Sequence, residues 1–289
     1  MIKGRIIKGV GGLYFIAACG FVYECAARGI FRKRGLTPTI GDHVEISVNK
    51  HDEKKGTIEK ILPRKNHLIR PRVANIDCEV IIFAAKSPDI NFDLLDRFLV
   101  FAEYNKIEDV VICINKNDLA DSEIIRRIYS PMYKVIYTSA EDKTGVDELK
   151  AELRGKVSVL TGPSGVGKSS LINCLIPGEK RQTGEISRKI ERGKHTTRQV
   201  ELLQADEDTF IVDSPGFTSL SLDYLYMKPE ELQYCFKEFL PYLDNCRFND
   251  CRHLAEPDCG LKAEIGRSIT KERYERFVQL YEELNNKNQ

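Results

Sequence analysis

The segment GPSGVGKS at residues 162–169 decides the central fold of this chain, and NKND at residues 115–118 precedes it. The first segment fits the phosphate-binding loop pattern G-x-x-x-x-G-K-[ST]. It follows a predicted strand, KVSVLT, and precedes a predicted helix, SSLINCLI, which is the context that such a loop requires. Its backbone N–H groups can surround a β-phosphate, and the helix that follows adds its dipole. We therefore expect a P-loop nucleotide-binding domain.

Two side chains of this loop carry the expected phosphate chemistry. Lys168 can reach the β- and γ-phosphate oxygens, and the Ser169 hydroxyl can bind Mg²⁺. The residues of the loop that we expect to contact GTP are Gly162, Pro163, Ser164, Gly165, Val166, Gly167, Lys168, Ser169 and Ser170.

NKND supplies the expected base loop, although this short pattern alone is also typical of an ordinary turn between a strand and a helix. It follows an apolar run at residues 110–114 that indicates a buried parallel strand, and ligands bind at the carboxyl ends of such strands. The Asp118 carboxylate can accept from N1–H and the amino group of guanine but would face a lone pair on adenine. A second loop, TSA, can offer the Ala140 N–H to guanine O6. The nucleotide is therefore predicted to be GTP, and the expected base-loop contacts are Asn115, Lys116, Asn117, Asp118, Ser139 and Ala140.

The polar stretch at residues 178–197 and the segment DSPG at residues 213–216 match the parts of a GTPase that respond to the γ-phosphate. We expect Asp213 to hold Mg²⁺ through water and Gly216 to meet the γ-phosphate. The polar stretch occupies the place of the first switch, and a threonine near its end should close on Mg²⁺. We prefer Thr197 over Thr196 as that ligand.

These motifs occur in a circularly permuted order. Ordinary GTPases begin with the phosphate loop and end with the two base loops, whereas here both base loops come first. Permutation leaves the neighbours in a sheet unchanged, because termini can move to any exposed loop. From about residue 71, strands alternate with helices, including an amphipathic helix over residues 92–106, so a doubly wound α/β domain is expected. The expected strands cover residues 78–85, 109–115, 133–139, 156–162, 198–204 and 209–215.

Composition indicates additional domains around this core. The chain has 289 residues and a mass of 33.0 kDa, which favours two or three domains. Residues 1–70 contain 14 Lys and Arg against 6 Asp and Glu, a net charge of +8, so residues 71–289 carry −7. Neither a membrane span nor the apolar core of a signal peptide is recognisable, and nine cysteines without such a signal indicate the reducing cytoplasm. The expected domains are residues 1–70, 71–220 and 221–289.

Residues 1–70 predict an OB-type β-barrel, because five short strands follow one another at short spacing. Two groups of basic residues stand out in this region. They are Arg28, Arg32, Lys33 and Arg34 in an expected loop around Phe31, and Arg64, Lys65 and Arg70 after the last strand. Such charges are commonly no more than solvated surface groups. Here the excess of eight positive charges, with aromatic residues nearby, favours RNA binding.

The segment NCRFNDCRHLAEPDCG at residues 245–260 predicts a metal site. Three thiolates and one imidazole match a closed tetrahedral Zn²⁺ site, with Cys246, Cys251, His253 and Cys259 as ligands. Small buried cysteines are common in proteins, but these three lie among polar neighbours, and a metal-held segment needs little apolar core. Helices expected over residues 229–243 and 262–284 would complete a small α-helical zinc-binding domain.

Together, these motifs resemble the bacterial RsgA family, also called YjeQ or YloQ, of circularly permuted GTPases that act in maturation of the small ribosomal subunit. The resemblance covers nearly the whole chain and rests on RPRVANID, NKND, TSA, GPSGVGKS, GKHTTR, DSPGF and the Cys-Cys-His-Cys segment. It implies an RNA-binding barrel, a GTPase core, a zinc domain and GTP hydrolysis strongly stimulated by the small subunit. The chain departs from the family at Ser214, where Thr is usual, and at Lys194, where Arg is usual.

The catalytic mechanism has a gap at Phe217. Ras-type enzymes place a Gln at this position to orient the attacking water, and Phe has no hydrogen-bonding group. His195 lies in the polar stretch and is the only histidine near the site. From the residues alone, His195 is equally compatible with an exposed loop residue that has no catalytic role. The family resemblance favours a catalytic role, with the ribosome ordering the loop. The expected catalytic residues are Lys168, His195 and Thr197.

The sequence thus predicts a cytoplasmic, monomeric GTPase that binds the small ribosomal subunit and its rRNA and does not associate with a membrane. It would use GTP and GDP, one structural Zn²⁺ and the Mg²⁺ that accompanies GTP. Two other classes stay open on the residues alone. One is a non-catalytic protein that uses GTP to fix a conformation. The other is a nucleotide kinase or an ATPase, against which Asp118 and Ala140 argue because both favour guanine.

Overall fold

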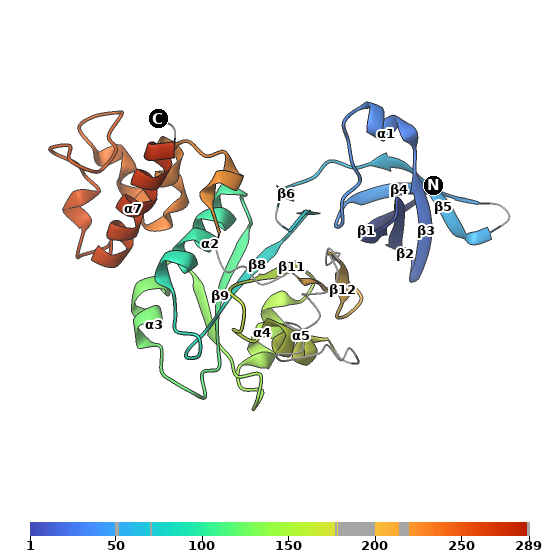
Figure 1. Ribbon diagram of the computed structural model, residues 1–289, viewed down its shortest axis with the longest axis horizontal. Helices are drawn as coiled ribbons and strands as arrows, with labels where there is room; N and C mark the ends of the chain where they lie inside the picture. Colours follow the sequence, from blue (N-terminus) through green and yellow to red (C-terminus); the bar gives the residue numbers. More distant parts are fainter. Residues whose placement is uncertain (50–51, 70, 177, 179–199, 214–219, 288–289) are drawn as a thin grey trace, which may run out of the picture.

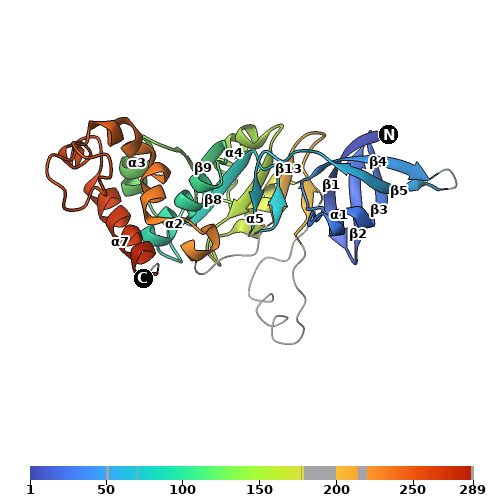
Figure 2. The ribbon, with the colours of Figure 1, turned by 90° about the horizontal axis from the view of Figure 1, so that it is seen from above.

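The structure is a computed structural model that describes residues 1–49, 52–69, 71–176, 178, 200–213 and 220–287. An N-terminal barrel and a C-terminal module (residues 220–287) lie at opposite ends of a central α/β domain (Figures 1 and 2). None of the helices in these ranges is both long enough and apolar enough to cross a membrane.

Five strands form the N-terminal barrel, in the order β1-β2-β3-β5-β4 around its wall. These strands are β1 (Ile2–Val10), β2 (Leu13–Ala18), β3 (Phe21–Ala27), β4 (His43–Asn49) and β5 (Asp52–Ile61). Alternate residues such as Ile6, Ile16, Val44, Ile46 and Ile58 point inward and are fully buried, as expected where one face of each strand lines a core. The closed barrel confirms the predicted OB-type architecture.

The basic segment between β3 and β4 is a short helix rather than the expected loop. Helix α1 (Gly29–Lys33) begins directly after β3, and Phe31 within it packs into the barrel core with 8% of its surface exposed. The loop prediction was wrong because Phe31 anchors this turn to the barrel. The same contact removes Phe31 from the group of surface rings available for stacking.

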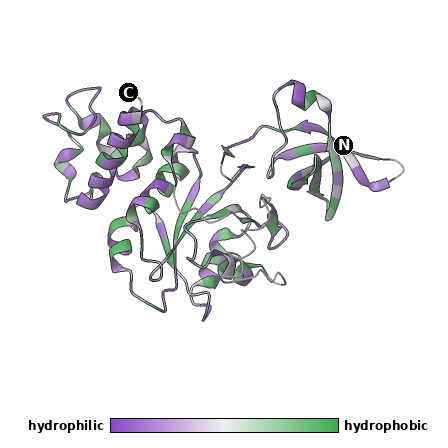
Figure 3. Ribbon diagram, in the orientation of Figure 1, coloured by the Kyte–Doolittle hydropathy of each residue, from purple (hydrophilic) through white to green (hydrophobic). Residues whose placement is uncertain are grey.

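The central sheet has six strands in the order β10-β9-β8-β11-β13-β12, all parallel except β12. They are β8 (Cys78–Ala84), β9 (Asp109–Asn115), β10 (Lys134–Tyr137), β11 (Val157–Thr161), β12 (Leu202–Gln204) and β13 (Phe210–Asp213). Hydrophobic residues follow these strands (Figure 3), and every residue of β8 is buried. The six strands predicted from the alternating pattern are confirmed.

Helices cover both faces of this sheet. Helices α2 (Phe92–Tyr104) and α3 (Glu123–Tyr129) pack on one face, and α4 (Val146–Leu153) and α5 (Lys168–Leu175) pack on the other. The phosphate loop follows β11, and the base loops follow β9 and β10. All three loops therefore lie at the carboxyl ends of parallel strands, with β8 between the strand of the phosphate loop and that of the base loop.

The C-terminal module contains more 3₁₀ structure than the sequence pattern predicts. It consists of η1 (Leu222–Leu225), η2 (Pro229–Cys235), η3 (Lys237–Asn245), η4 (Lys262–Glu264) and α7 (Lys271–Lys287). The helix expected over residues 229–243 breaks at Phe236, whose backbone is extended, and Pro241 inside η3 has no N–H to donate. The helix expected over residues 262–284 starts only at Lys271, because Gly266 has a φ of +81°.

The hydrophobic core of the C-terminal module is continuous with the core under α2 and α3. The rings of Phe236 and Phe239 stack on each other, and both meet the Phe277 ring edge to face. All three belong to the same buried cluster as Leu95 and Phe98 of α2. The barrel core is a separate cluster. The domain boundaries predicted at residues 70 and 220 stay predictions.

Candidate nucleotide and metal sites

The path of the phosphate loop depends on glycines at two positions. Gly162 has a φ of +138°, and a Cβ there would lie 2.1 Å from the carbonyl oxygen of Ile82. Gly167 has a φ of +94°, and a Cβ there would lie 2.3 Å from Nδ2 of Asn115. Any side chain at either position would therefore force the loop away from the neighbouring strands. Tight contact between the loop and the sheet explains these glycines.

Lys168 begins α5 and reaches back across the phosphate loop. Its Nζ donates to the carbonyl oxygens of Gly162 at 2.9 Å and Pro163 at 2.6 Å, and only 8% of the residue is exposed. Ser169 and Ser170 are half-buried on the first turn of α5, while Ser164 and Gly165 are exposed at the tip of the loop. The ammonium group thus lies where the loop's own N–H groups and the start of the helix would attract an anion.

Asn115 joins the three nucleotide loops to one another. Its Nδ2 donates to the carbonyl oxygen of Val166 at 2.9 Å, and its Oδ1 accepts from the Ala140 N–H and the Thr138 hydroxyl, each at 3.2 Å. The residue is 1% exposed. A buried amide that satisfies both ends in this way fixes the phosphate loop, the base loop and the TSA loop as one unit.

The rest of the base loop leaves its carboxylate accessible. The Asn117 N–H donates to the Thr138 carbonyl at 3.1 Å, which places the loop beside the TSA segment. Asp118 is exposed, Ala140 is half-buried, and Ser139 is almost fully buried. The structure therefore brings together the predicted base-loop residues at the carboxyl ends of β9 and β10.

A segment that the sequence reasoning missed forms a further wall of this site. Residues 85–91 follow β8, and the Ala85 N–H donates to the Asn115 carbonyl at 2.8 Å. The Lys116 ammonium donates to the Ser87 carbonyl, and Pro88 lies 3.8 Å from the position of a Cβ on Gly165. The signal available in the sequence was positional, since this segment also follows the carboxyl end of a parallel strand.

The expected residues on the γ-phosphate side of the site lie at the end of β13 or outside the described residues. Asp213 ends β13, whose backbone pairs with Leu160 just before the phosphate loop. His195, Thr197 and Gly216 lie outside the described residues, as do Thr196, Lys194, Ser214 and Phe217. Their assignments as catalytic, Mg²⁺-binding or γ-phosphate-binding residues stay predictions.

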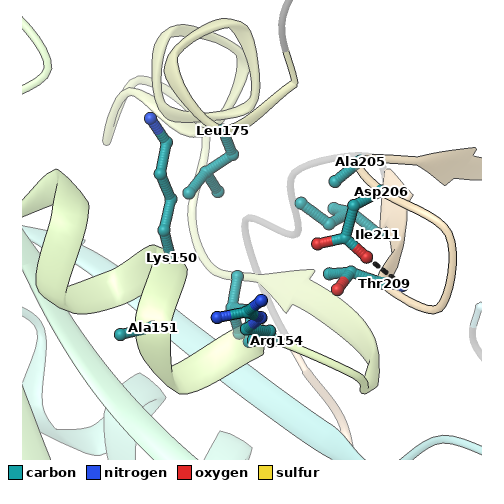
Figure 4. A pocket seen from close by; sticks show the side chains of 9 residues that line it. Lys150, Ala151, Arg154, Leu175, Ala205, Asp206, Thr209 and Ile211 are labelled. Carbon is teal, nitrogen blue, oxygen red and sulfur yellow. Dashed lines mark hydrogen bonds between the residues drawn. The ribbon is translucent and has the colours of Figure 1, made fainter.

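A cavity of about 380 Å³ lies on the side of the sheet where the parallel strands begin, opposite the nucleotide loops (Figure 4). Lys150 and Arg154 reach toward it from α4 and its end, and Asp206 lies across from them in the turn between β12 and β13. Thr209, just before β13, lines it as well, so the cavity faces the amino ends of the parallel strands. None of the predicted nucleotide ligands lines it, and it is separate from the candidate GTP site.

Three cysteines and one histidine of the C-terminal module converge as predicted. The ligand atoms of Cys246, Cys251, His253 and Cys259 all lie within 4.8 Å of one another. The two sulfurs of Cys246 and Cys259 are 3.8 Å apart, and Nδ1 of His253 lies 3.5 and 3.4 Å from them. Atoms about 2.3 Å from a tetrahedral Zn²⁺ would be about 3.8 Å apart. The spacing therefore fits one tetrahedral ion.

Protonation in this cluster also fits a metal site. Nε2 of His253 lies 2.7 Å from the Gln233 side-chain oxygen, which can only accept, so Nε2 carries the proton and Nδ1 keeps its lone pair for a metal. Burial lowers the pKa of His253, which favours the neutral ring. Burial also raises the pKa of the Cys251 thiol to about 12, so a thiolate there needs a cation beside it.

The barrel residues expected to contact RNA divide into two groups. Arg28 pairs with Glu59 at 2.7 Å, Arg64 makes a two-pronged pair with Asp42, and Lys65 pairs with Asp77. The second group, Arg32, Lys33 and Arg34, is exposed around the end of α1, and Arg70 lies outside the described residues. The accessible basic surface is therefore smaller than composition alone indicated.

A P-loop after β11, a base loop after β9 and a six-stranded sheet define this protein as a circularly permuted P-loop GTPase. The family model described as RsgA GTPase matches residues 61–223, and the model for the RsgA N-terminal domain matches residues 3–58. The chain belongs to the RsgA family and is a GTP hydrolase. This assignment excludes the nucleotide kinase, ATPase and non-catalytic alternatives.

Individual relatives match along almost the full chain. The small ribosomal subunit biogenesis GTPase RsgA of Alkaliphilus metalliredigens is 48% identical, with 98% of each chain covered. The crystal structure of YjeQ from Thermotoga maritima is 35% identical with a TM-score of 0.85, and 98% of each chain is covered. The crystal structure of YloQ, described as a circularly permuted GTPase, is 32% identical with a TM-score of 0.82, covering 99% of this chain and 96% of the other.

Proposed function

We propose that this protein binds the small ribosomal subunit and assists its late maturation, and that the subunit stimulates hydrolysis of GTP to GDP and phosphate. The observation that carries this proposal is the match to an RsgA protein named for small-subunit biogenesis over 98% of both chains. Exposed Arg32, Lys33 and Arg34 on the barrel supply a surface suited to rRNA phosphates. We further propose that the protein acts in the cytoplasm as a monomer.

The test is GTP turnover measured alone and with small subunits, large subunits or free rRNA at equal concentration. We expect a slow basal rate, because Phe217 cannot orient the attacking water, and strong stimulation by small subunits only. Equal stimulation by large subunits would contradict the proposed partner.

The proposed catalytic residues are tested by substitution. His195→Ala should keep GTP binding and lose most of the stimulated rate. Thr197→Ala is the companion test of the proposed Mg²⁺ ligand.

For the nucleotide, we propose that Asp118 reads guanine and that Lys168, Ser169 and the Asp213 carboxylate act on phosphate and Mg²⁺. Asp118→Asn replaces an acceptor with an amide that can donate, so preference should move from GTP toward XTP. Buried hydrogen-bonded sites reject a mismatched partner by roughly 10⁴-fold. Unchanged affinities for both nucleotides would contradict the base-loop assignment. Asp121→Asn, at an exposed aspartate outside the expected contacts, is the control for the loss of one negative charge.

For the C-terminal module, we propose that the Cys246, Cys251, His253 and Cys259 cluster holds one structural Zn²⁺. The spacing of the ligand atoms and the proton on Nε2 of His253 support this metal over a harder cation, which would favour oxygen ligands. Metal analysis of the purified protein should give one zinc per chain. Magnesium or iron at that stoichiometry would contradict the assignment.

A further inference from the structure

The C-terminal module contacts helix α2 along its whole length. Near the start of α2, the Arg276 guanidinium lies 5.9 Å from the centre of the Phe92 ring. In the next turn, Arg97 makes a two-pronged pair with Glu283 of α7, at 3.1 and 2.5 Å. Near the end of α2, Glu103 pairs with Lys237 of η3 at 2.9 Å. These contacts fix α2 against the module at both ends and in between.

A buried ionic network extends this attachment to helix α3. Arg273 of α7 is 2% exposed and donates to Asp96 of α2 at 2.6 Å and to Glu238 of η3 at 2.6 and 3.3 Å. Tyr129, the last residue of α3, donates its hydroxyl to the same Asp96 at 2.8 Å. Because one fully buried carboxylate accepts from both α3 and α7, a shift of either helix would remove a hydrogen-bond donor from Asp96.

At the surface, a second link joins α3 directly to α7. Nη2 of Arg127 lies 2.6 Å from Oε1 of Glu272, and both side chains are partly exposed, at 57% and 39%. This pair lies at the edge of the interface, so it can be reversed without placing a charge in the core.

Helix α2 directly follows residues 85–91, the further wall of the nucleotide site, and helix α3 follows the base loop. Helix α3 begins at Glu123, five residues after Asp118. Helix α2 follows residues 85–91, where the Ser87 carbonyl accepts from Lys116 and Pro88 lies against Gly165. Displacement of α7 would therefore be transmitted to the base loop and to residues 85–91, which contact both the base loop and the phosphate loop.

We propose that the C-terminal module controls the release of guanine nucleotide by fixing α2 and α3, and through them the base loop. Asp96, Arg273 and Arg127 are positioning residues in this scheme, because they act through the helices and do not touch the nucleotide. The coupling concerns affinity and dissociation, and it leaves the hydrolysis step to the phosphate side of the site. This inference rests on the proposed base loop but is independent of the ribosomal subunit as partner.

The test uses the full-length isolated protein loaded with a fluorescent GDP. Arg127→Glu places two acids opposite each other across α3 and α7, and we expect GDP to dissociate about fivefold faster. Single-turnover hydrolysis at saturating GTP should keep the wild-type rate. The double variant Arg127→Glu/Glu272→Arg restores an ion pair of reversed polarity and should restore slow release. Glu275→Lys is the matched control, because it breaks an exposed ion pair with Lys271 within α7.

Three results would overturn the proposal. The first is wild-type release from Arg127→Glu, and the second is fast release that persists in the double variant. The third is a loss of hydrolysis at saturating GTP with unchanged release, which would place the coupling at the γ-phosphate instead. Since no ribosomal subunit is present in this assay, its failure is distinguishable from a failure of subunit stimulation. Loss of guanine preference in Asp118→Asn separately tests the base loop on which the proposal rests.

Discussion

The barrel and the C-terminal module flank the same GTPase domain, but they are attached to it in different ways. The barrel has its own core, and its contacts with the sheet include the Lys8–Glu201 ion pair at 3.2 Å and Arg5 stacked 5.3 Å from the Phe210 ring. The C-terminal module has no separate hydrophobic cluster among the described residues and joins the core beneath α2. From this difference we expect the barrel to unfold as a separate unit and the C-terminal module to unfold together with the GTPase domain.

The largest expected effect comes from removing one of the proposed zinc ligands. Cys251→Ala should abolish stoichiometric zinc, which carries folding free energy on the order of 10 kcal/mol in small modules. Because the core is shared, hydrogen exchange should accelerate in α2 and α3 as well as in the module, while the barrel keeps its protection. Cys235→Ala, at a buried cysteine outside the cluster, is the control and should retain zinc. Acceleration confined to residues 220–287 would break the comparison.

A smaller loss is expected from Arg273→Met. The substitution leaves Glu238 buried without the Arg273 cation and leaves Asp96 with only the longer ion pair to Arg276 at 3.6 Å; breaking such a buried ionic network typically costs about 3–5 kcal/mol. Urea unfolding should show one less stable transition for the GTPase domain and the module together. Arg267→Met, at an exposed arginine of the same module, should change stability little. Two separate transitions, with only the module destabilised, would argue for independent folding.

Stability should also depend on pH through Glu79 in the shared domain. This carboxyl group is fully buried, accepts from the Thr161 hydroxyl at 2.7 Å, and burial raises its pKa from 4.5 to about 8. Between these pH values the unfolded chain has lost the proton that the folded chain keeps, so the free energy of unfolding falls as pH rises. Glu79→Gln cannot ionise and should be a few kcal/mol more stable than wild type at pH 8, with the difference lost near pH 4.5.

The measurement for Glu79 is urea unfolding at several pH values between 4.5 and 8. Glu148→Gln, at an exposed position on α4, is the control and should follow the wild-type profile. The pH-dependent transition should include the C-terminal module and exclude the barrel. Parallel profiles for Glu79→Gln and wild type would show that Glu79 is ionised in the folded protein.

The smallest effect is expected at the junction with the barrel. Lys8→Ala removes an ion pair whose side chains are 37% and 40% exposed, so it should cost less than about 1 kcal/mol and less still at high salt. Differential scanning calorimetry at low and high salt would measure it. A loss comparable to that of Arg273→Met would mean that the barrel is fastened as firmly as the module.

The sequence was sufficient to predict the sheet, the permuted loops, the barrel and the metal cluster, because each has a local signature. Residue type and spacing identify a P-loop or a Cys₃His set without knowledge of what packs nearby. The shared core had no such signature. Asp96 and Arg273 resemble ordinary charged positions on amphipathic helices, and only the fold shows that they meet in the interior. Burial can be predicted from periodicity, but the partner of a buried face cannot.

The sequence pattern also did not predict where helices break or how distant loops bind one another. Nothing in residues 229–243 marks Phe236 as the point where the chain becomes extended, because tertiary packing of its ring decides it. Likewise, Asn115 was predicted as a nucleotide contact from its motif, while its hydrogen bonds to Val166 and Ala140 depend on loops that are distant in the sequence.

The position of β11 at the centre of the sheet also has a consequence for biosynthesis. Strands β8, β9 and β10 form one half of the sheet and leave the ribosome first, but β8 pairs on its other side with β11, which ends at Thr161. Until that residue has been synthesised, the nascent chain carries a largely apolar strand, β8, with one edge unpaired, and such an edge is a template for aggregation. Because of the permuted order, this vulnerable interval of folding comes before the phosphate loop at residues 162–169 has been translated.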